Sequence, residues 1–171
     1  AIAIPVHEPD GSVKVNGDTG IVFVLLPGGP FLMGAQSADR GAPNFDADAF
    51  DDESPHQVSL APFFLARHEL TQGQWLRLAM GKLERRPSNH RAGTQNLFGG
   101  TITLSHPVER VDWGMCDSLL TQHGLVLPTE AQWEYGCRAG SATPWWTGIE
   151  RDSLIDKVNL ADQAAKDAGA P

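Results

Sequence analysis

Basic side chains are scarce in this 171-residue chain, because 13 lysines and arginines stand against 21 aspartates and glutamates and leave a formal net charge of −8. Such a balance argues against nucleic acids and anionic membrane surfaces as partners. Long apolar runs are also missing: the longest, Ile21 to Leu26, is far shorter than the roughly 18 residues that a membrane helix needs. No signal peptide is visible at Ala1. We therefore expect a soluble protein and favour the cytoplasm as its compartment.

Cysteine is rare as well, with only Cys116 and Cys137, which lie too far apart for a CxxC pair. They allow a disulfide, two buried thiols, or one of each. We favour two buried thiols, because free cysteine commonly packs like a small apolar residue. No second cysteine or histidine pair stands at zinc-ligand spacing, so we expect no zinc site.

Glycine (18) and proline (12) are abundant, which predicts a fold rich in turns and loops. Runs of β-branched, aromatic or alternating residues predict short strands at Ile21 to Leu26, Phe31 to Gly34 and Pro55 to Leu60. The first of these has the composition of a buried strand. The turn signal from Pro27 to Pro30 stands between the first two and predicts a β-hairpin.

Three helices are predicted from their caps. Thr71 and Thr129 are each followed three residues later by glutamine, which is the pattern of a capping box. Asp112 is placed to cap a helix between these two. Trp113 and Trp133 stand at helical core spacing, so we expect both side chains to pack in the interior.

Two polar regions raise the question of metal binding. The loop from Ala35 to Ser54 is rich in carboxylates, which suit calcium, but its spacing does not match an EF-hand, so we favour a solvated acidic loop. His68 beside Glu69 could be a ligand, yet a single histidine next to a helix start is more often structural.

Several segments occur together in the order of a known pattern: Phe31 to Gly34, Glu53 to Val58, Glu69 to Trp75, Pro107-Val108 with Val111 to Trp113, and Leu127 to Tyr135. From about Gly20 to Asp162 the chain resembles the N-terminal part of the formylglycine-generating enzyme family, also called the sulfatase-modifying-factor domain. The resemblance implies an α+β, C-type-lectin-like fold in an enlarged, loop-rich form. We expect residues 1–19 to be a tail or linker and residues 20–171 to be the N-terminal portion of such a domain.

The best-known activity of this family is the oxidation of a sulfatase cysteine to formylglycine, with oxygen and with copper bound by two thiolates. In the family these cysteines lie in a C-terminal segment well beyond the block around Tyr135, and neither Cys116 nor Cys137 matches them. We therefore assign no catalytic residue and expect copper only if a missing C-terminal half carries the cysteine pair. The chain alone is predicted to be inactive. For a relative such as an iron-dependent sulfoxide synthase, the six scattered histidines give no convincing ligand set.

The resemblance also implies a structural calcium ion, bound by an asparagine side chain and the next backbone carbonyl. Asn159 and Leu160 match that pair, and the remaining ligands would lie beyond Pro171. An equally open interpretation is that Asn159 only turns the chain.

Noncatalytic relatives within the family suggest an alternative function, a C-type-lectin-like module that binds a protein or peptide ligand on its loops. Trp145 and Trp146 are the candidate exposed ligand-binding residues. The remainder of its own polypeptide is a second expected partner. A third possibility is an appendage of a larger bacterial protein such as a signalling kinase, with the residues before Gly20 as a linker.

Overall fold

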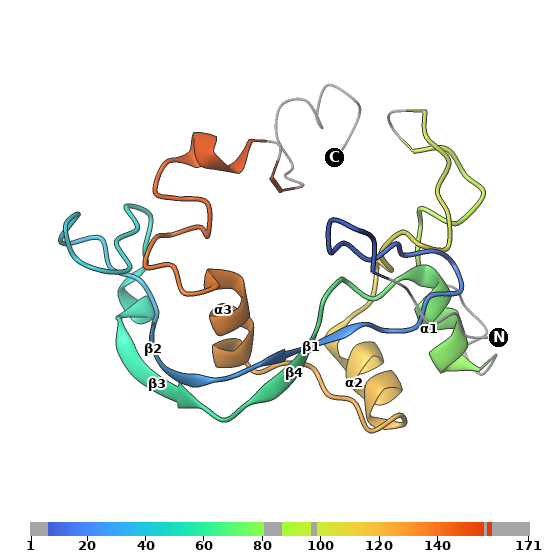
Figure 1. Ribbon diagram of the computed structural model, residues 1–171, viewed down its shortest axis with the longest axis horizontal. Coiled ribbons are helices and arrows are strands. Elements are labelled where there is room, and N and C mark those ends of the chain that lie inside the picture. The colour runs from blue at the N-terminus through green and yellow to red at the C-terminus, as the bar shows by residue number, and fades with distance from the viewer. Residues whose placement is uncertain (1–6, 81–86, 97–98, 156, 159–171) are drawn as a thin grey trace. The chain divides into compact units, whose positions relative to one another are not determined.

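The structure, a computed structural model, describes residues 7–80, 87–96, 99–155 and 157–158 (Figure 1). The chain divides into two compact units. Unit 1 is formed by Ala1–Val24, Ala66–Leu127 and Asp162–Pro171, and unit 2 by Leu25–Leu65 and Pro128–Ala161. Among the described residues, no helix has the length and apolar character required to cross a membrane.

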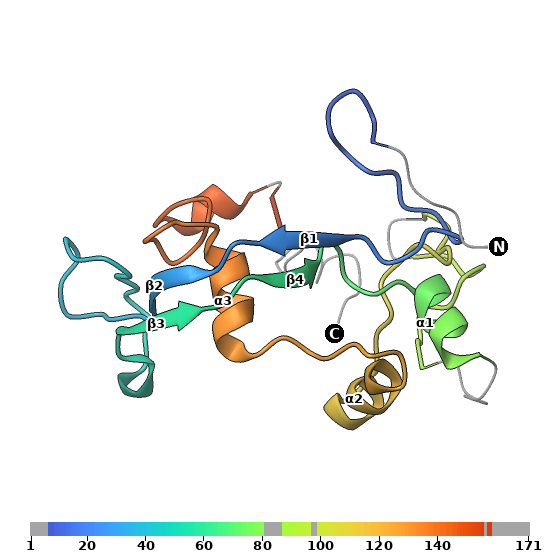
Figure 2. The ribbon, with the colours of Figure 1, turned by 60° about the horizontal axis from the view of Figure 1, so that its bottom comes forward.

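Within the part of the chain that the structure describes, four short strands form two two-stranded sheets. β2 (Gly29–Met33) pairs antiparallel with β3 (His56–Leu60), with Gly29 opposite Leu60 and Met33 opposite His56. β1 (Phe23–Leu26) pairs with β4 (Phe63–Ala66), and both pairs can be followed in Figure 2. Because short α-helices accompany these small sheets, the fold is α+β.

The predicted hairpin between the first two strands is wrong, because each of them pairs with a later strand. At Pro27 and Gly28 the chain passes from the β1–β4 sheet to the β2–β3 sheet without reversing its direction. Pro27 has no backbone N–H for a sheet hydrogen bond. Gly28 has a φ of 67°, and a Cβ there would stand 2.4 Å from the carbonyl oxygen of Leu60, so no other residue fits without a backbone shift.

The expectation that the first strand is buried is also wrong. Phe23, Val24 and Leu25 are 41%, 40% and 58% exposed. A sheet of two strands buries a face only where another element covers it. Helix α3 (Glu130–Arg138) contacts β2 and β3 and also reaches Phe63 of β4, whereas Phe23, Val24 and Leu25 stay largely exposed.

Unit 1 is organised around α1 (Gln72–Ala79) and α2 (Trp113–Thr121). Its core comprises Trp75 and Ala79 from α1 and Leu119 from α2, of which Trp75 is only 1% exposed. Fully burying a tryptophan ring is among the largest apolar contributions that one side chain makes. The described residues of unit 1 therefore depend on a small core with Trp75 at its centre.

The predicted capping box at the start of α1 is confirmed. The backbone N–H of Thr71 donates to Oε1 of Gln74 over 2.9 Å, and the N–H of Gln74 donates back to the Thr71 hydroxyl over 3.2 Å. The amide of Gln74 also donates to the carbonyls of Thr19 and Gly20, at 3.3 and 2.9 Å. Arg77 donates to the carbonyls of Gly17 and Thr19. Polar side chains of α1 thus fix the segment that precedes β1.

The predicted cap of α2 is confirmed, since the Asp112 carboxylate accepts from the N–H of Met115 over 2.8 Å. The prediction that Trp113 packs in the core is wrong, because its side chain is 70% exposed. Met115, Cys116 and Leu119 share the inward face of the helix, whereas Trp113 is its first residue and lies on another face.

The capping box of α3 is confirmed in the same way, with Thr129 and Gln132 exchanging hydrogen bonds of 3.0 and 3.2 Å. Tyr135 is the aromatic residue that packs on the strands. Its ring meets Phe31 and Phe63 edge-on, at centroid distances of 5.3 and 6.0 Å, and its hydroxyl donates to the carbonyl of Gly28 over 2.7 Å.

Trp133, which we also expected in the core, is 60% exposed. It precedes Tyr135 by two residues, which is roughly 200° around a helix, so the two side chains lie on opposite faces. Helical spacing identified an amphipathic helix but did not identify which aromatic residue faces inward.

Replacing Gly34 by alanine is expected to destabilise unit 2 by at least about 3 kcal/mol, because its φ is 93° and the new Cβ would stand 2.2 Å from the Glu53 carbonyl oxygen. Gly29 at the other end of β2 provides the matched control. Its φ is 102° with nothing within 4 Å of the added Cβ, so Gly29→Ala should cost about 1–2 kcal/mol. Urea unfolding followed by circular dichroism measures both, and equal losses would contradict the steric explanation.

Candidate functional site

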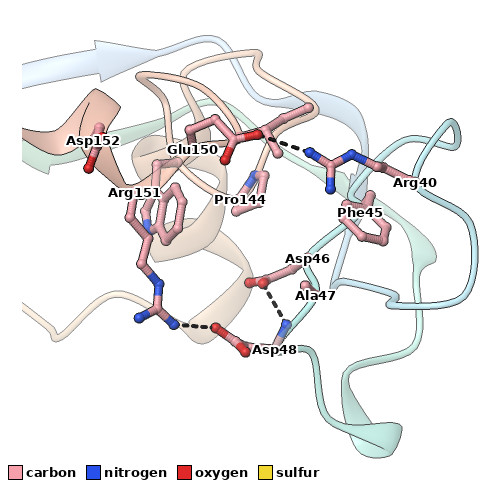
Figure 3. Close-up of a pocket in the computed structure, with 11 residues that line it drawn as sticks. Arg40, Phe45, Asp46, Ala47, Asp48, Pro144, Glu150, Arg151 and Asp152 are labelled. Atoms are coloured by element: carbon pink, nitrogen blue, oxygen red, sulfur yellow. Dashed lines mark hydrogen bonds and ion pairs between the residues drawn. The ribbon is translucent and has the colours of Figure 1, made fainter.

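Unit 2 contains a hollow of about 410 Å³, lined by the loop at residues 40–48 and by the segment at residues 144–152 (Figure 3). Its volume lies within the roughly 300–1,000 Å³ that small-molecule sites occupy. The charged residues of its lining are Arg40, Asp46, Asp48, Glu150, Arg151 and Asp152. We call this cavity the hollow of unit 2.

Two ion pairs connect the loop to the later segment. A terminal nitrogen of Arg40 lies 2.9 Å from Oε1 of Glu150, and one of Arg151 lies 2.5 Å from Oδ2 of Asp48 (Figure 3). All four side chains are at least 69% exposed. Exposed pairs of this kind contribute only about 0–1 kcal/mol each, so they can be exchanged for other partners at little cost.

Aromatic side chains form the apolar part of the lining. The guanidinium carbon of Arg40 lies 5.8 Å from the ring centroid of Phe45, which is within cation–π range. Trp145 lines the hollow too. It is held in a tight turn, in which Trp145 and Gly148 exchange backbone hydrogen bonds of 3.3 and 3.0 Å and the Thr143 hydroxyl donates to the Trp145 carbonyl over 2.6 Å.

The two predicted ligand-binding residues therefore occupy different positions. Trp145 is half-buried and belongs to the lining of the hollow of unit 2, whereas Trp146 is 52% exposed and is not among the lining residues.

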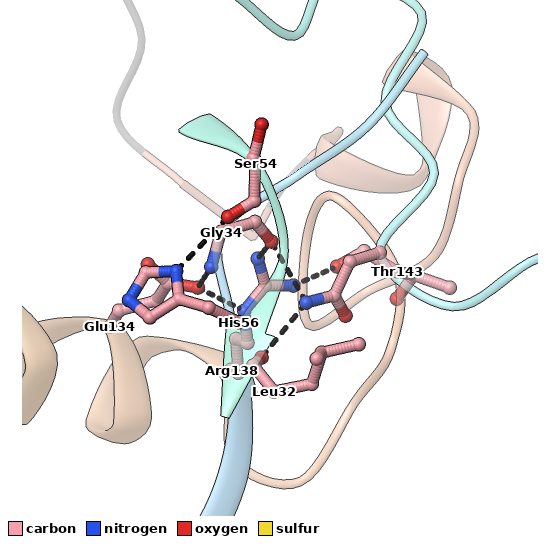
Figure 4. A network of polar contacts seen from close by, with 8 residues as sticks. Leu32, Gly34, Ser54, His56, Glu134, Arg138 and Thr143 are labelled. Carbon is pink, nitrogen blue, oxygen red and sulfur yellow. Dashed lines mark hydrogen bonds and ion pairs between the residues drawn. The ribbon is translucent and has the colours of Figure 1, made fainter. Parts of the chain in front are cut away.

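A polar network next to the hollow holds its loop in place (Figure 4). Asn44 adopts a left-handed φ of 58° and is 2% exposed. Its amide donates to the carbonyls of Leu32 and Gly34, both over 2.8 Å, and its own N–H donates to the carbonyl of Ala142 over 2.9 Å. Asn44 thus ties the acidic loop both to the end of β2 and to the chain after α3.

The Glu134–Arg138 pair forms the other half of this network. One oxygen of Glu134 accepts from the N–H of Gly34 over 2.8 Å and from Nε of Arg138 over 2.7 Å. Arg138 also donates to the carbonyls of Gly34 and Thr143, at 2.8 and 3.2 Å. The Arg138 and Glu134 side chains are only 13% and 20% exposed, so this pair is screened less than the pairs at the hollow.

Sequence reasoning assigned no role to these network residues. Glu134 and Arg138 stand four positions apart on a capped helix, and that spacing was the signal for an ion pair. Asn44 carried no comparable signal, because its left-handed backbone depends on carbonyls from β2 and from the chain after α3.

Both cysteines are free, which excludes the disulfide alternative in this structure. Cys116 is half-buried in α2, but Cys137 is exposed on α3, so the expectation of two buried thiols is wrong for Cys137. Burial raises the pKa of the Cys116 thiol, and the nearby Asp112 carboxylate adds to the effect. At neutral pH the Cys116 thiol therefore has a smaller reactive thiolate fraction than an unperturbed cysteine.

The predicted calcium ligands, Asn159 and Leu160, lie outside the described residues. Among the residues that are described, no three or more histidine, cysteine, aspartate or glutamate side chains form a group that could hold a metal ion. Asp39, Asp48 and Asp51 of the acidic loop are exposed.

Alkylation should separate the two thiols. We expect iodoacetamide to label Cys137 about tenfold faster than Cys116 at neutral pH, because the raised pKa of Cys116 keeps its reactive thiolate fraction small until the pH rises. Peptide mass spectrometry over a pH series measures both rates, with Cys116→Ser and Cys137→Ser as matched controls. Equal rates at neutral pH would show that Cys116 is not shielded from the reagent and that its pKa is not raised.

Removing the Glu134 carboxylate should destabilise unit 2. Glu134→Ala leaves Nε of Arg138 and the Gly34 N–H without their acceptor, which is expected to cost about 2–3 kcal/mol. Glu130→Ala on the exposed first turn of the same helix should cost under about 1 kcal/mol. Hydrogen exchange of the β2 and α3 amides measures the difference, and similar protection in both variants would contradict the role of the network.

Comparison with solved structures supports the architecture. The structure of PvdO from Pseudomonas aeruginosa superposes with a TM-score of 0.54, covering 75% of this chain and 51% of PvdO at 24% identity. At this identity the likeness shows the fold alone.

The curated relatives that match in sequence include a formylglycine-generating enzyme and a hercynine oxygenase. The formylglycine-generating enzyme of Mus musculus is 46% identical over 49 residues, which are 27% of this chain and 13% of the mouse protein. The hercynine oxygenase of Mycolicibacterium smegmatis is 26% identical over 189 residues, covering 94% of this chain and 41% of that protein. The chain therefore spans less than half the length of these relatives. A family match at residues 12–168 covers most of the sequence, and the chain belongs to the sulfatase-modifying factor enzyme 1-like domain family.

Proposed function

We propose that this chain is the N-terminal portion of a C-type-lectin-like domain and that the complete protein is an oxidase of the formylglycine-generating kind, acting on a cysteine of a protein substrate. The observation that carries this proposal is the family match over residues 12–168. It is supported by relatives named as a formylglycine-generating enzyme and an oxygenase.

In the proposed oxidase, the described part of the chain serves as a structural scaffold. Tyr135 packs α3 on the strands, while Glu134 and Arg138 hold the end of β2 at Gly34. None of these side chains is assigned a reacting role. Their part in the proposed reaction is to fix the loops that a substrate would meet, which is the usual relation between a rigid scaffold and functional loops.

The cysteines do not fit the two-thiolate copper site that the family implies. Cu(I) is bound by soft ligands, and the family uses a pair of thiolates. Cys116 and Cys137 do not stand at the positions of the copper-binding pair that the family resemblance implies. We therefore assign no step of the reaction to copper on these residues and propose that both copper ligands come from elsewhere in the complete protein.

We also propose, from the family resemblance alone, that Asn159 and Leu160 contribute part of a structural calcium site. The amide oxygen of Asn159 and the carbonyl of Leu160 are ligand types that calcium prefers.

An oxidation assay tests the principal proposal. The complete protein is supplied with copper, oxygen, a thiol reductant that reduces the second oxygen atom to water, and a peptide carrying a sulfatase-type cysteine. It is expected to form an aldehyde that a hydrazide reagent traps, whereas the 171-residue chain should form none. Cys116→Ser and Cys137→Ser in the complete protein should retain the activity. Absence of aldehyde from the complete protein would overturn the oxidase proposal, and loss of activity in either variant would overturn the assignment of the copper ligands.

A second candidate function is noncatalytic binding of a protein or peptide ligand. The observation that favours it is the hollow of unit 2, which combines Trp145 with a cluster of charged side chains. A ligand site of this kind is compatible with an oxidase domain or with a domain that lacks catalysis.

A further inference from the structure

We infer that the hollow of unit 2 binds an organic cation, namely the guanidinium or ammonium group of a basic side chain in a peptide ligand. This inference rests on the binding function proposed for the same hollow and adds the chemical class of its ligand. It is independent of the proposed oxidase activity.

The charges of the lining favour a cation. Four carboxylates face two guanidiniums, which leaves an excess of negative charge. Both guanidiniums are already paired, Arg40 with Glu150 and Arg151 with Asp48. Among the described residues Asp46 and Asp152 have no ion-pair partner, although Asp46 accepts a hydrogen bond from the N–H of Asp48 over 3.0 Å. The charge of the lining that has no counter-ion is therefore acidic.

The aromatic part of the lining favours the same class of ligand. Arg40 already places its guanidinium 5.8 Å from the centre of the Phe45 ring, which shows that a cation is accommodated against an aromatic residue of this lining. Trp145 provides a second ring, and indole is the strongest cation–π partner among the aromatic side chains. A ligand cation near Trp145 would gain from the ring and from the excess carboxylates together.

The lining is also held in place before a ligand arrives. Asn44 fixes the acidic loop through its hydrogen bonds to the end of β2. The Thr147 hydroxyl lies 2.9 Å from that of Ser153, which closes the turn after Trp145 onto the next segment. Such preorganisation reduces the entropy lost on binding. The exposed ion pairs remain exchangeable, so a ligand cation can compete for the carboxylates of Asp48 and Glu150.

Titration of the isotope-labelled chain with Nα-acetyl-arginine amide, followed by amide and indole NMR signals, tests the inference. We expect saturable shifts at Trp145 and Asp46, a similar response to Nα-acetyl-lysine amide, and weaker binding as salt is added. Nα-acetyl-citrulline amide has nearly the same shape as the arginine probe but no charge, and it should bind at least several-fold more weakly.

Matched variants locate the site. Trp145→Ala should weaken binding of the arginine probe on the order of tenfold, the loss expected for one desolvated cation–π contact. Trp146→Ala, at the adjacent position outside the lining, should leave the affinity unchanged. Asp46→Asn and Asp152→Asn keep the side-chain shape and should each weaken binding several-fold, which tests the inference even if Trp145→Ala does not fold.

Several results would overturn the inference. Equal affinity for the citrulline and arginine probes would show that the hollow binds ligands without selecting charge, so that the binding function stands and the cationic class fails. Unchanged affinity in both aspartate variants, or equal losses in the Trp145 and Trp146 variants, would place the cation elsewhere. No saturable shift with either cationic probe would overturn the inference outright, and the aldehyde assay of the complete protein would be unaffected by any of these results.

Discussion

The carboxylate of Glu134 is the contact on which the arrangement of unit 2 depends most. A single oxygen receives the backbone N–H of Gly34 and the Nε of Arg138, and the same guanidinium reaches the carbonyls of Gly34 and Thr143. Three parts of the chain therefore meet at one partly buried ion pair: the end of β2, α3, and the segment that leads to Trp145. The hollow lies next to this ion pair, because the two segments that line it, residues 40–48 and 144–152, follow Gly34 and Thr143, whose carbonyls Arg138 binds.

Unit 1 is organised by a different kind of interaction. Its helix α1 buries Trp75 on one side and uses Gln74 and Arg77 to bind the carbonyls of the segment before β1. A helix of 8 residues is too short to be stable alone, so these tertiary contacts supply its stability. In both units, short capped helices thus act as anchors for irregular chain, which explains how a fold with so little regular structure is defined.

The sequence predicted local features well and non-local ones poorly. The caps at Thr71, Asp112 and Thr129 were correct because a cap is decided by residues within one helical turn. The predicted pairing of the strands was wrong, because the Pro-Gly signal after Leu26 fits a hairpin and also fits a chain that continues from one sheet into the next. The burial of Trp133 failed for a related reason: helical spacing fixes which residues share a face, but only the strands that α3 meets decide which face is inside. The hollow could be predicted only as far as Trp145, since its other wall lies about a hundred residues earlier in the chain.

Unit 2 is assembled from two stretches of chain, Leu25–Leu65 and Pro128–Ala161, with most of unit 1 encoded between them. During synthesis β2, β3 and β4 leave the ribosome well before α3, so Phe31 of β2 and Phe63 of β4 lack their contact with Tyr135 while the intervening residues are made. Nascent chains with uncovered apolar ribbons are prone to association. The order of the segments thus leaves the apolar side chains of these strands uncovered until α3 has been synthesised. The segment that contains α1 and α2 is synthesised in the meantime and can fold first.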